Sequence, residues 1–484
     1  MRDDPTAAAT GDMDPEEFRR HAHAVVDWMA DYFRDIETYP VLARVQPGET
    51  AAKLPPGAPE HPAPMDEILR DFGETVVPGV THWNHPDFFA YFAISGSGPG
   101  VLGEMLTAAL NVNAMVWRTG PSPTELEERS LDWLRQMMGL PADFRGHIQD
   151  TASISSLTAI ATAREEAGLR IREEGMSGRD LPRLRLYCSE EAHSSIEKAG
   201  VTLGIGRAGT RRIPTDDEFR MDPTALEAAI REDLANGWKP FCVVATVGTT
   251  STTSVDPVAR IADVAERHGL WLHVDAAYAG SAAVAPEMRW ILDGCERADS
   301  LVVNPHKWLF VPVDCSALFV RRPERVAHAF SVLPEYLVTP EGGAATNLMD
   351  LGPALGRRFR ALKLWMVLRY FGREGIAARI REHCRLAREF AGWVDETPGW
   401  ERLAPVPFST VVFRIGPEGM ADEEADRLNE RVLERVNATG EAFLSHTRIR
   451  GRFALRLAVG NLRTGEENVR NAWRLLREAG EREA

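Results

Sequence analysis

The chain has 484 residues, of which 44% are hydrophobic and 26% are charged, so it is too long for one small core and too apolar for a disordered protein. Its formal net charge of −15 opposes binding to nucleic acid or to an anionic membrane surface, because both attract clustered Lys and Arg. The five cysteines lack CxxC spacing, the N-terminus lacks the features of a signal peptide, and no stretch is long and uncharged enough to span a bilayer. We therefore expect a cytoplasmic protein without disulfides, bound metal, nucleic acid or a membrane partner.

The first predicted element is an amphipathic helix. Asp14 and Pro15 suit the N-cap and the first helical position, and apolar residues follow at helical spacing as far as Ile36. The proline-rich stretch over residues 45–64 then predicts an extended connection, since prolines exclude regular helix and central strand. Residues 1–97 are interpreted as an N-terminal helical segment that lies across a neighbouring surface.

From residue 98 to residue 362, predicted helices alternate with short apolar runs, which predicts an α/β domain with a mainly parallel sheet. The runs expected as strands are 184–188, 241–247, 270–274, 301–303 and 317–320. In open sheets of this kind, ligands bind beyond the carboxyl ends of the strands. Thr249, Thr250, Asp275 and Asn304 directly follow such runs, so this edge of the sheet is the predicted site.

Residues 363–484 are predicted to form a smaller α+β domain. A long helical stretch begins it, and residues 408–413 and 453–459 are expected to be strands. Thr464 and Glu467 have the spacing of a capping box, in which a hydroxyl and a carboxylate cap a helix start reciprocally. We expect that box to open the last helix.

Asp275 and Lys307 end two expected neighbouring strands and together suggest pyridoxal 5'-phosphate. A lysine condenses with the aldehyde of this cofactor, and a carboxylate keeps its ring nitrogen protonated so that the ring acts as an electron sink. Taken alone, each residue has a plainer explanation, because aspartates often end strands in turns and lysines are usually solvated. Lys307, however, lies between Pro305 and Trp308 on an apolar segment, where burial would lower its pKa and favour condensation.

Two further segments fit the same cofactor. Thr151, Ala152 and Ser153 precede an apolar helical pattern, so their N–H groups and hydroxyls could hold a phosphate, although an ordinary Ser/Thr cap is the plainer alternative. His193 follows the expected strand 184–188, where its ring could stack on a planar cofactor and carry a proton near the substrate. A satisfied or solvated histidine is the alternative at that position.

Six motifs occur in order along the chain. They are 85–92 (HPDFFAYF), 124–127 (TELE), 192–195 (AHSS), 273–280 (HVDAAYAG), 304–308 (NPHKW) and 355–360 (LGRRFR). Together they resemble the pyridoxal-phosphate-dependent group II decarboxylases, specifically the aromatic-L-amino-acid decarboxylase branch, over nearly the whole chain. The resemblance implies a fold-type-I enzyme with the three parts predicted above, and a homodimer whose active sites lie at the subunit interface.

The resemblance also implies a role for each matching residue. Lys307 would form the Schiff base with pyridoxal 5'-phosphate, Asp275 would pair with its ring nitrogen, and His193 would stack on its ring. The other cofactor-binding residues would be Thr151, Ala152, Ser153, Thr250, Ala277, Asn304 and His306. Tyr336 would belong to a mobile catalytic loop and would protonate the carbon from which carbon dioxide has left.

Tyr336 and His193 bear on the reaction as well. Related enzymes that oxidise the amine to an aldehyde lack this tyrosine or carry another residue in place of this histidine. The joint presence of Tyr336 and His193 in this chain favours simple decarboxylation of an aromatic L-amino acid to its amine, with an aromatic aldehyde synthase as the alternative. A non-catalytic pyridoxal-phosphate-binding regulator is a remote third reading, because it would need a DNA-binding helix pair and a basic surface.

The resemblance places an aromatic amino-acid substrate in a largely aromatic pocket. Its lining would be Trp83, Tyr91, Phe92, Ala93, Ile94, Asn113, Met115 and Gly356, whereas Phe88 and Phe89 are expected to be core residues. Asn113 and Met115 match positions that reach into the site from the other subunit, where the family often has apolar or aromatic residues. Gly356 matches a position at which glycine accompanies indole substrates, which favours a tryptophan-like substrate over DOPA, tyrosine or phenylalanine.

Asp150 departs from the pattern, because relatives commonly have glycine just before the phosphate-binding residues. A carboxylate that faces a phosphate would be electrostatically costly. We therefore expect the Asp150 side chain to turn away from the phosphate-binding position, towards solvent or an arginine.

Overall fold

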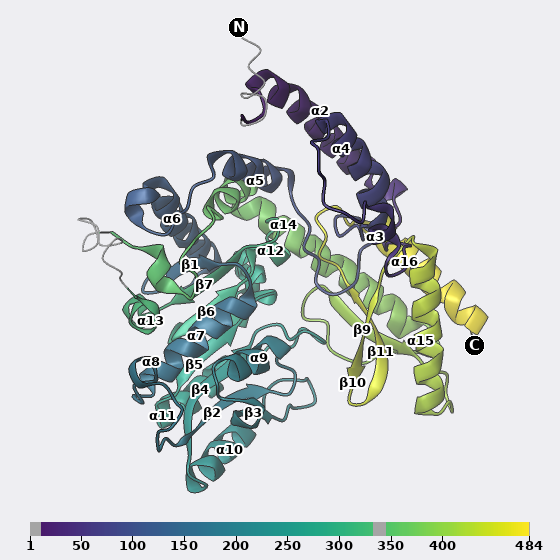
Figure 1. Cartoon of the computed structure of the whole chain (residues 1–484). Helices are drawn as coiled ribbons and strands as arrows, with labels where there is room; N and C mark the ends of the chain where they lie inside the picture. The colour runs from purple at the N-terminus through teal and green to yellow at the C-terminus, as the bar shows by residue number, and fades with distance from the viewer. Residues whose placement is uncertain (1–10, 333–344, 484) are drawn as a thin grey trace.

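The computed structural model describes residues 11–332 and 345–483. A large α/β domain surrounds a seven-stranded sheet, and a smaller domain surrounds a four-stranded sheet (Figure 1). The N-terminal helices project beyond both. No helix within the described ranges is long and apolar enough to cross a membrane.

The large sheet has the strand order β1-β7-β6-β5-β4-β2-β3. Its strands are β1 (Arg145–Gln149), β2 (Arg183–Ser189), β3 (Thr210–Ile213), β4 (Trp238–Thr246), β5 (Trp271–Asp275), β6 (Ser300–Val303) and β7 (Ser316–Val320). Five adjacent strands, β6, β5, β4, β2 and β3, run parallel to one another. Strand β7 runs antiparallel to both of its neighbours, β1 and β6. The predicted mainly parallel sheet is confirmed.

Both faces of this sheet are covered by helices. The helices of the large domain are α5 (Gly98–Leu110), α6 (Pro121–Met138), α7 (Ala152–Glu166), α8 (Ile171–Glu174), α9 (Ser194–Thr202), α10 (Pro223–Ala235), α11 (Val258–His268), α12 (Pro305–Trp308) and α13 (Pro323–Phe330). In β4, Val243 and Ala245 join the core beneath α10 and α11, whereas Cys242 and Val244 join the core beneath α7 and α9. Because successive side chains of a strand point to opposite faces, a strand between two helical layers is apolar throughout.

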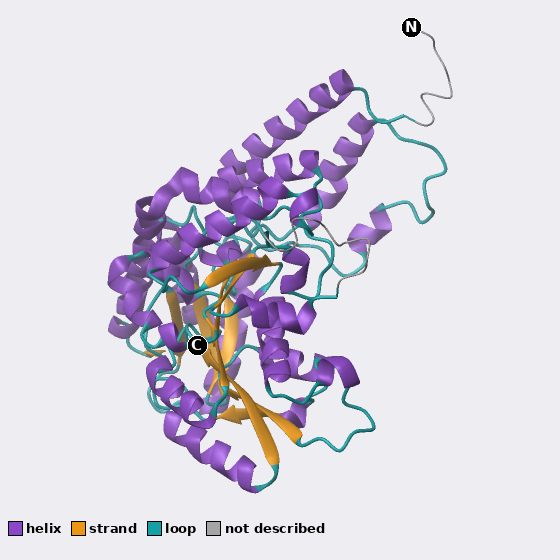
Figure 2. Ribbon diagram, turned by 90° about the vertical axis from the view of Figure 1, so that its left-hand side faces the viewer, coloured by secondary structure: helices purple, strands orange, loops and turns teal. Residues whose placement is uncertain are grey.

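The N-terminal part contains α2 (Pro15–Arg34), α3 (Glu49–Lys53) and α4 (Met65–Asp71). Asp14 caps α2 as predicted, since its carboxylate accepts the N–H of Glu16 over 2.9 Å. These helices project as an arm from the rest of the chain (Figure 2). The prediction that residues 45–64 hold no helix was wrong, because α3 fits between Pro47 and Pro55 as little more than one turn.

The smaller domain begins with α14 (Ala361–Glu396), which bends at Gly372, where φ is 60°. Its other elements are β8 (Trp400–Arg402), β9 (Thr410–Ile415), α15 (Asp422–Thr439), β10 (Ser445–Ile449), β11 (Arg452–Ala458) and α16 (Glu466–Glu483). The four strands form an antiparallel sheet in the order β10-β11-β9-β8. The predicted domain boundaries stay predictions, and α14 crosses the one at 362/363.

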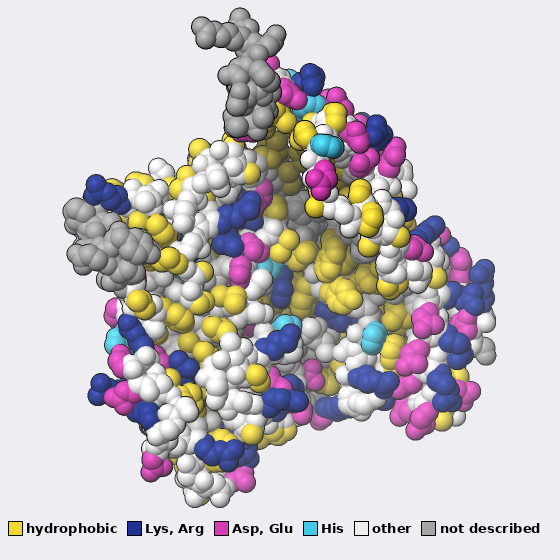
Figure 3. Space-filling view, in the orientation of Figure 1, with side chains coloured by type: hydrophobic (Ala, Val, Ile, Leu, Met, Phe, Trp, Pro, Cys, Tyr) yellow, Lys and Arg dark blue, Asp and Glu magenta, His cyan; other side chains and the backbone are white. Residues whose placement is uncertain are grey.

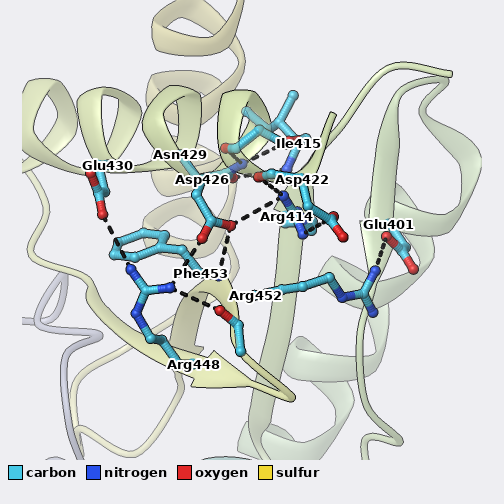
Figure 4. Close-up of polar contacts among 12 residues, drawn as sticks. Glu401, Arg414, Ile415, Asp422, Asp426, Asn429, Glu430, Arg448, Arg452 and Phe453 are labelled. Carbon is cyan, nitrogen blue, oxygen red and sulfur yellow. Dashed lines mark hydrogen bonds and ion pairs between the residues drawn. The ribbon is translucent and has the colours of Figure 1, made fainter. Parts of the chain in front are cut away.

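A buried arginine ties α15 to the small sheet. Arg414 on β9 is 2% exposed and pairs with Asp422 and Asp426 of α15, while Asp426 also accepts from Arg448 and from the N–H of Phe453 (Figure 4). A buried guanidinium needs such partners, because an unpaired buried charge is costly. This network is structural and lies in the smaller domain.

Two elements differ from their prediction for local reasons. Strand β1 was not predicted, because its sequence RGHIQ contains one aliphatic residue and therefore has no apolar run. Helix α16 was predicted, but the capping box was wrong: the Thr464 hydroxyl donates to the Pro86 carbonyl over 2.5 Å, and the Gly465 N–H donates to Asn468 Oδ1. Thr464 therefore joins the helix start to the segment after the N-terminal arm.

Candidate active site

Asp275 and Lys307 come together at the carboxyl edge of the large sheet. Asp275 is the last residue of β5, and β6, the parallel neighbour of β5, leads through Asn304 into α12, which carries Lys307. Asp275 is buried, and its Oδ1 accepts the N–H of Ala277 over 3.1 Å. Burial lowers the pKa of Lys307, the charge of Arg456 lowers it further, and Asp275 opposes both. A lowered pKa makes more of the neutral amine available, and that form attacks a carbonyl.

His193 joins this pair from the start of α9. It is the N-cap residue, and its Nδ1 accepts the N–H of Ser195 over 3.2 Å and lies 2.8 Å from Ser195 Oγ. The pKa of His193 is lowered chiefly by desolvation, with Asp275 raising it and Lys307 lowering it. The ring is exposed in the single chain, so one side of it is open to a ligand.

Arg456 on β11 is a site residue that the sequence analysis missed. It is 3% exposed, its guanidinium lies 4.6 Å from the centroid of the Phe92 ring, and Lys307 Nζ lies 5.2 Å from the same centroid. Its Nη1 donates to the Tyr91 carbonyl, whereas Nη2 is buried without a hydrogen-bond partner among the described residues. Burial lowers its pKa to about 10. An orphaned charged donor next to Lys307 is suited to hold an anion.

Phe92 begins a stack of rings behind the lysine. Its ring stacks on Tyr278 at 3.8 Å, and Tyr278 stacks on Trp308 at 4.7 Å. Tyr278 is buried, and its hydroxyl lies 2.5 Å from Ser409 Oγ of the smaller domain. The stack fixes α12, and therefore the lysine, against both domains.

The other residues predicted to line the substrate pocket near Phe92 differ in how exposed they are. Trp83 stacks on Phe88 at 4.4 Å and on Tyr91 at 5.8 Å. Tyr91 is 55% exposed, Ala93 is buried and Ile94 is half-buried, whereas Phe88 and Phe89 are fully buried as predicted. The exposed Tyr91 ring is the member of this wall that a ligand or a partner can reach.

The predicted phosphate-binding segment starts α7. Thr151 is the N-cap, its side chain makes no capping bond to the helix, and Ser153 is exposed in the first turn. The Thr151 N–H donates to Asp150 Oδ1 over 2.5 Å, and the Thr151 hydroxyl lies 3.0 Å from the same oxygen. The expectation that Asp150 turns away was wrong, because its carboxylate is the acceptor nearest to these two donors.

The remaining predicted cofactor residues border the same edge. Asn304 is buried, and its Oδ1 has no hydrogen-bond partner within the described ranges. His306 Nδ1 accepts the N–H of Cys315 over 2.9 Å, and burial lowers the pKa of His306 to about 3, so this ring is neutral. Ala277 is buried beside Asp275, and Thr250 is exposed in the loop after β4.

Asn113, Met115 and Gly356 form a second group at the surface of the chain. Asn113 Oδ1 accepts the N–H of Arg357 over 2.9 Å, and its Nδ2 lies 3.6 Å from Met115 Sδ. A Cβ on Gly356 would lie 3.8 Å from Asn113 Nδ2. The three predicted specificity residues are therefore neighbours, and Asn113 and Gly356 are exposed in the single chain.

The comparisons with known proteins agree on one family. The model of the pyridoxal-dependent decarboxylase conserved domain matches residues 47–416. The chain belongs to this family. A tryptophan decarboxylase of Camptotheca acuminata is 41% identical over 99% of this chain and 97% of its own length, and a phenylacetaldehyde synthase of Arabidopsis thaliana is 40% identical over 96% of each. The crystal structure of Oryza sativa TDC with PLP and tryptamine, at 39% identity, superposes with a TM-score of 0.94 over 98% of this chain and 99% of that one.

These likenesses confirm the aromatic-amino-acid branch of the group II decarboxylases and the fold-type-I architecture. The cofactor of this decarboxylase is pyridoxal 5'-phosphate. The residues present fit it: a half-buried lysine with a lowered pKa lies at the strand edge beside a buried carboxylate, and the first turn of α7 has no side-chain cap. The buried Asn304 Oδ1 is a further polar atom without a partner among the described residues. Tyr336 lies outside the described residues, so its role stays a prediction.

Proposed function

We propose that this protein removes carbon dioxide from an aromatic L-amino acid and releases the corresponding amine, with a tryptophan-like substrate favoured. The observation that carries the proposal is the convergence of Lys307, Asp275, His193 and Arg456 on one edge of the large sheet. Bound pyridoxal 5'-phosphate supplies an electron sink for the pair of electrons that carbon dioxide leaves behind. The side chains of this chain hold, orient and protonate the reactants.

Each of these residues has a task that its environment permits. Lys307 offers a neutral amine that carries and exchanges protons, because burial lowers its pKa. Asp275 keeps a proton on the ring nitrogen of the cofactor by charge pairing in a buried position. His193 covers the open side of the site with a ring that is held by Ser195.

Arg456 is proposed to hold the carboxylate of the amino acid through its orphaned Nη2. A guanidinium fixed by the Tyr91 carbonyl would orient that group without rearrangement. Arg456→Met is expected to raise KM for aromatic amino acids about 10- to 100-fold, the usual cost of a hydrogen bond to a charged group. The amine product lacks the carboxylate, so its inhibition constant as a competitor should stay unchanged.

Steady-state kinetics with the amino acid and inhibition by the amine measure the two effects of Arg456→Met separately. Arg448→Met is the matched control, because it removes the same charge from β10, where Arg448 pairs with Asp426 (Figure 4). If Arg456→Met weakened the binding of the amino acid and of the amine equally, a role specific to the carboxylate would be contradicted. Arg456→Lys tests whether a positive charge alone is sufficient to bind the carboxylate.

Oxidative decarboxylation to an aldehyde is the second candidate function. The observation that favours it is the phenylacetaldehyde synthase, which is as similar to this chain as the tryptophan decarboxylase. The presence of Tyr336 together with His193 supports the amine as product, because a proton donor at the reacting carbon competes with its oxidation. Incubating the holoenzyme with a panel of aromatic amino acids, and measuring amine, aldehyde and hydrogen peroxide together, tests the two candidates.

Tyr336→Phe is expected to divert the product from amine to aldehyde, because phenylalanine has no proton to donate. Most of the product should then appear as aldehyde, with molecular oxygen reduced to hydrogen peroxide and ammonia released, and the amine yield should fall by about 10-fold or more, the usual range for a positioned acid. Tyr370→Phe, a change at a tyrosine that is 72% exposed on α14, is the control. An amine yield equal to that of the unmodified protein would refute the proton-donor role.

We also propose that the protein is a homodimer whose partner subunit covers the group of Asn113, Met115 and Gly356. Support comes from apolar side chains that the single chain leaves exposed on α2 and α5, among them Phe18, Leu106 and Leu110, each more than half exposed. Figure 3 shows hydrophobic side chains gathered in a recess beside the N-terminal helices. Apolar surface of this extent usually marks an interface. A cytoplasmic location stays a prediction, and all five cysteines are buried free thiols.

A further inference from the structure

Asp150 holds the two donors of Thr151 that the start of α7 offers to a ligand. Its Oδ1 accepts the Thr151 N–H over 2.5 Å and lies 3.0 Å from the Thr151 hydroxyl. Helix α7 has 15 residues, and the Thr151 side chain makes no capping bond to it. The chain's own carboxylate therefore lies at the positive end of this helix, which favours any anion.

A phosphate at this position needs the same donors and carries the same sign of charge. At neutral pH a phosphate monoester bears a charge of about −1.5 to −2, so it is repelled by a carboxylate within hydrogen-bonding distance of its own ligands. The Thr151 N–H can serve only one acceptor well. The carboxylate of Asp150 and a phosphate on Thr151 thus exclude one another.

We propose that Asp150 is an internal competitor for the cofactor phosphate, which must displace the carboxylate from Thr151 in order to bind. This inference rests on the proposed role of Thr151, Ala152 and Ser153 as the phosphate-binding segment. It makes Asp150 a residue that sets cofactor affinity, because in the cofactor-free chain Asp150 Oδ1 pairs with the Thr151 N–H and hydroxyl, and the phosphate must break both contacts.

A cation is available to the displaced carboxylate. Arg360 is half-buried, and its Nε donates to Asp314 Oδ1 over 2.7 Å. The pKa of Arg360 is raised even though burial lowers it, because Asp314 hydrogen-bonds it and the charges of Asp314 and Asp150 add to that effect. The charge of Asp150 thus already acts on Arg360, which is the cation offered to the displaced carboxylate.

The test compares cofactor forms with and without the phosphate. The full chain is stripped of cofactor with hydroxylamine, dialysed, and titrated with pyridoxal 5'-phosphate and separately with pyridoxal, with Schiff-base absorbance as the readout. Asp150→Ala is expected to lower Kd for pyridoxal 5'-phosphate by about tenfold and to leave Kd for pyridoxal unchanged. Asp150→Asn keeps an acceptor oxygen without the charge, so its gain should be smaller.

Melting temperatures give a second readout. Without cofactor, Asp150→Ala should melt below the unmodified protein, because the Thr151 N–H and hydroxyl lose their acceptor. With saturating pyridoxal 5'-phosphate, the rise in melting temperature should be larger for Asp150→Ala than for the unmodified protein. Asp143→Ala is the matched control, since it removes an equal charge from an exposed position paired with Arg321. An unchanged Kd for pyridoxal 5'-phosphate, or equal shifts for both cofactor forms, overturns the proposal. If the unmodified protein does not distinguish the two forms at all, the phosphate assignment itself fails.

Discussion

Lys307→Ala is expected to abolish the Schiff-base absorbance of the holoenzyme and to lower decarboxylation on the order of 10³-fold or more, the scale of losses when a covalent catalytic group is removed. Lys307 is the lysine at the carboxyl edge beside Asp275, and its lowered pKa provides the neutral amine that condensation with an aldehyde requires. Absorbance spectra and single-turnover assays measure the two losses independently.

Lys307→Arg is the matched variant for this prediction, because it places a permanent positive charge near Phe92 and Asp275 but cannot condense with an aldehyde. It should fail as fully as the alanine variant. Persistence of the Schiff-base absorbance in either variant would show that another amine holds the cofactor. Recovery of activity in the arginine variant would show that Lys307 contributes only a positive charge and no covalent bond to the cofactor.

The second large effect is expected at Asp275. Asp275→Asn keeps an oxygen that can accept the N–H of Ala277, now 3.1 Å from Oδ1, so the turn after β5 should persist. The amide cannot balance a protonated ring nitrogen, and breaking a buried charge pair costs about 3–5 kcal/mol. We expect kcat to fall about 10²- to 10³-fold, at roughly 1.4 kcal/mol per factor of ten, while the Schiff base still forms.

Asp256→Asn is the control for Asp275→Asn. Asp256 is also buried, and its two oxygens accept the N–H groups of Met221 and Thr246, but it does not belong to the site. Its amide variant should lose stability and keep most of its kcat. A kcat for Asp275→Asn within tenfold of the unmodified protein would contradict the assignment of Asp275 to the ring nitrogen.

The local pattern of apolar residues was sufficient to predict the strands at the centre of the large domain. The apolar runs that became β4, β5 and β6 are buried on both faces, so nearly every side chain in them is apolar and the run is visible in the sequence. Strand β1 escaped because Gly146, His147 and Gln149 interrupt that pattern, although the His147 and Gln149 side chains are buried. Its pairing with β7 depends on residues far away in the chain.

The candidate site divides in the same way. Asp275 ends a strand, Lys307 and His193 each follow one, and the carboxyl ends of parallel strands share one edge, so the approach of these three residues could be predicted. The approach of Arg456 to this site could not be predicted, because Arg456 lies inside a strand of the smaller domain. One arginine in an apolar run predicts a side chain at a solvated edge of the sheet. Its position over Phe92 depends on how the two domains pack.

The sequence by itself determined the family, the cofactor and the meeting of Asp275, Lys307 and His193 at one edge of the large sheet, because strand and helix periodicity and the motifs at strand ends are local properties. The tertiary structure alone decided that Arg456 lies next to Lys307, that Asn113 meets Gly356, and that Asp150 occupies the donors of Thr151. These contacts depend on the packing of distant segments and on side-chain rotation, and periodicity contains neither.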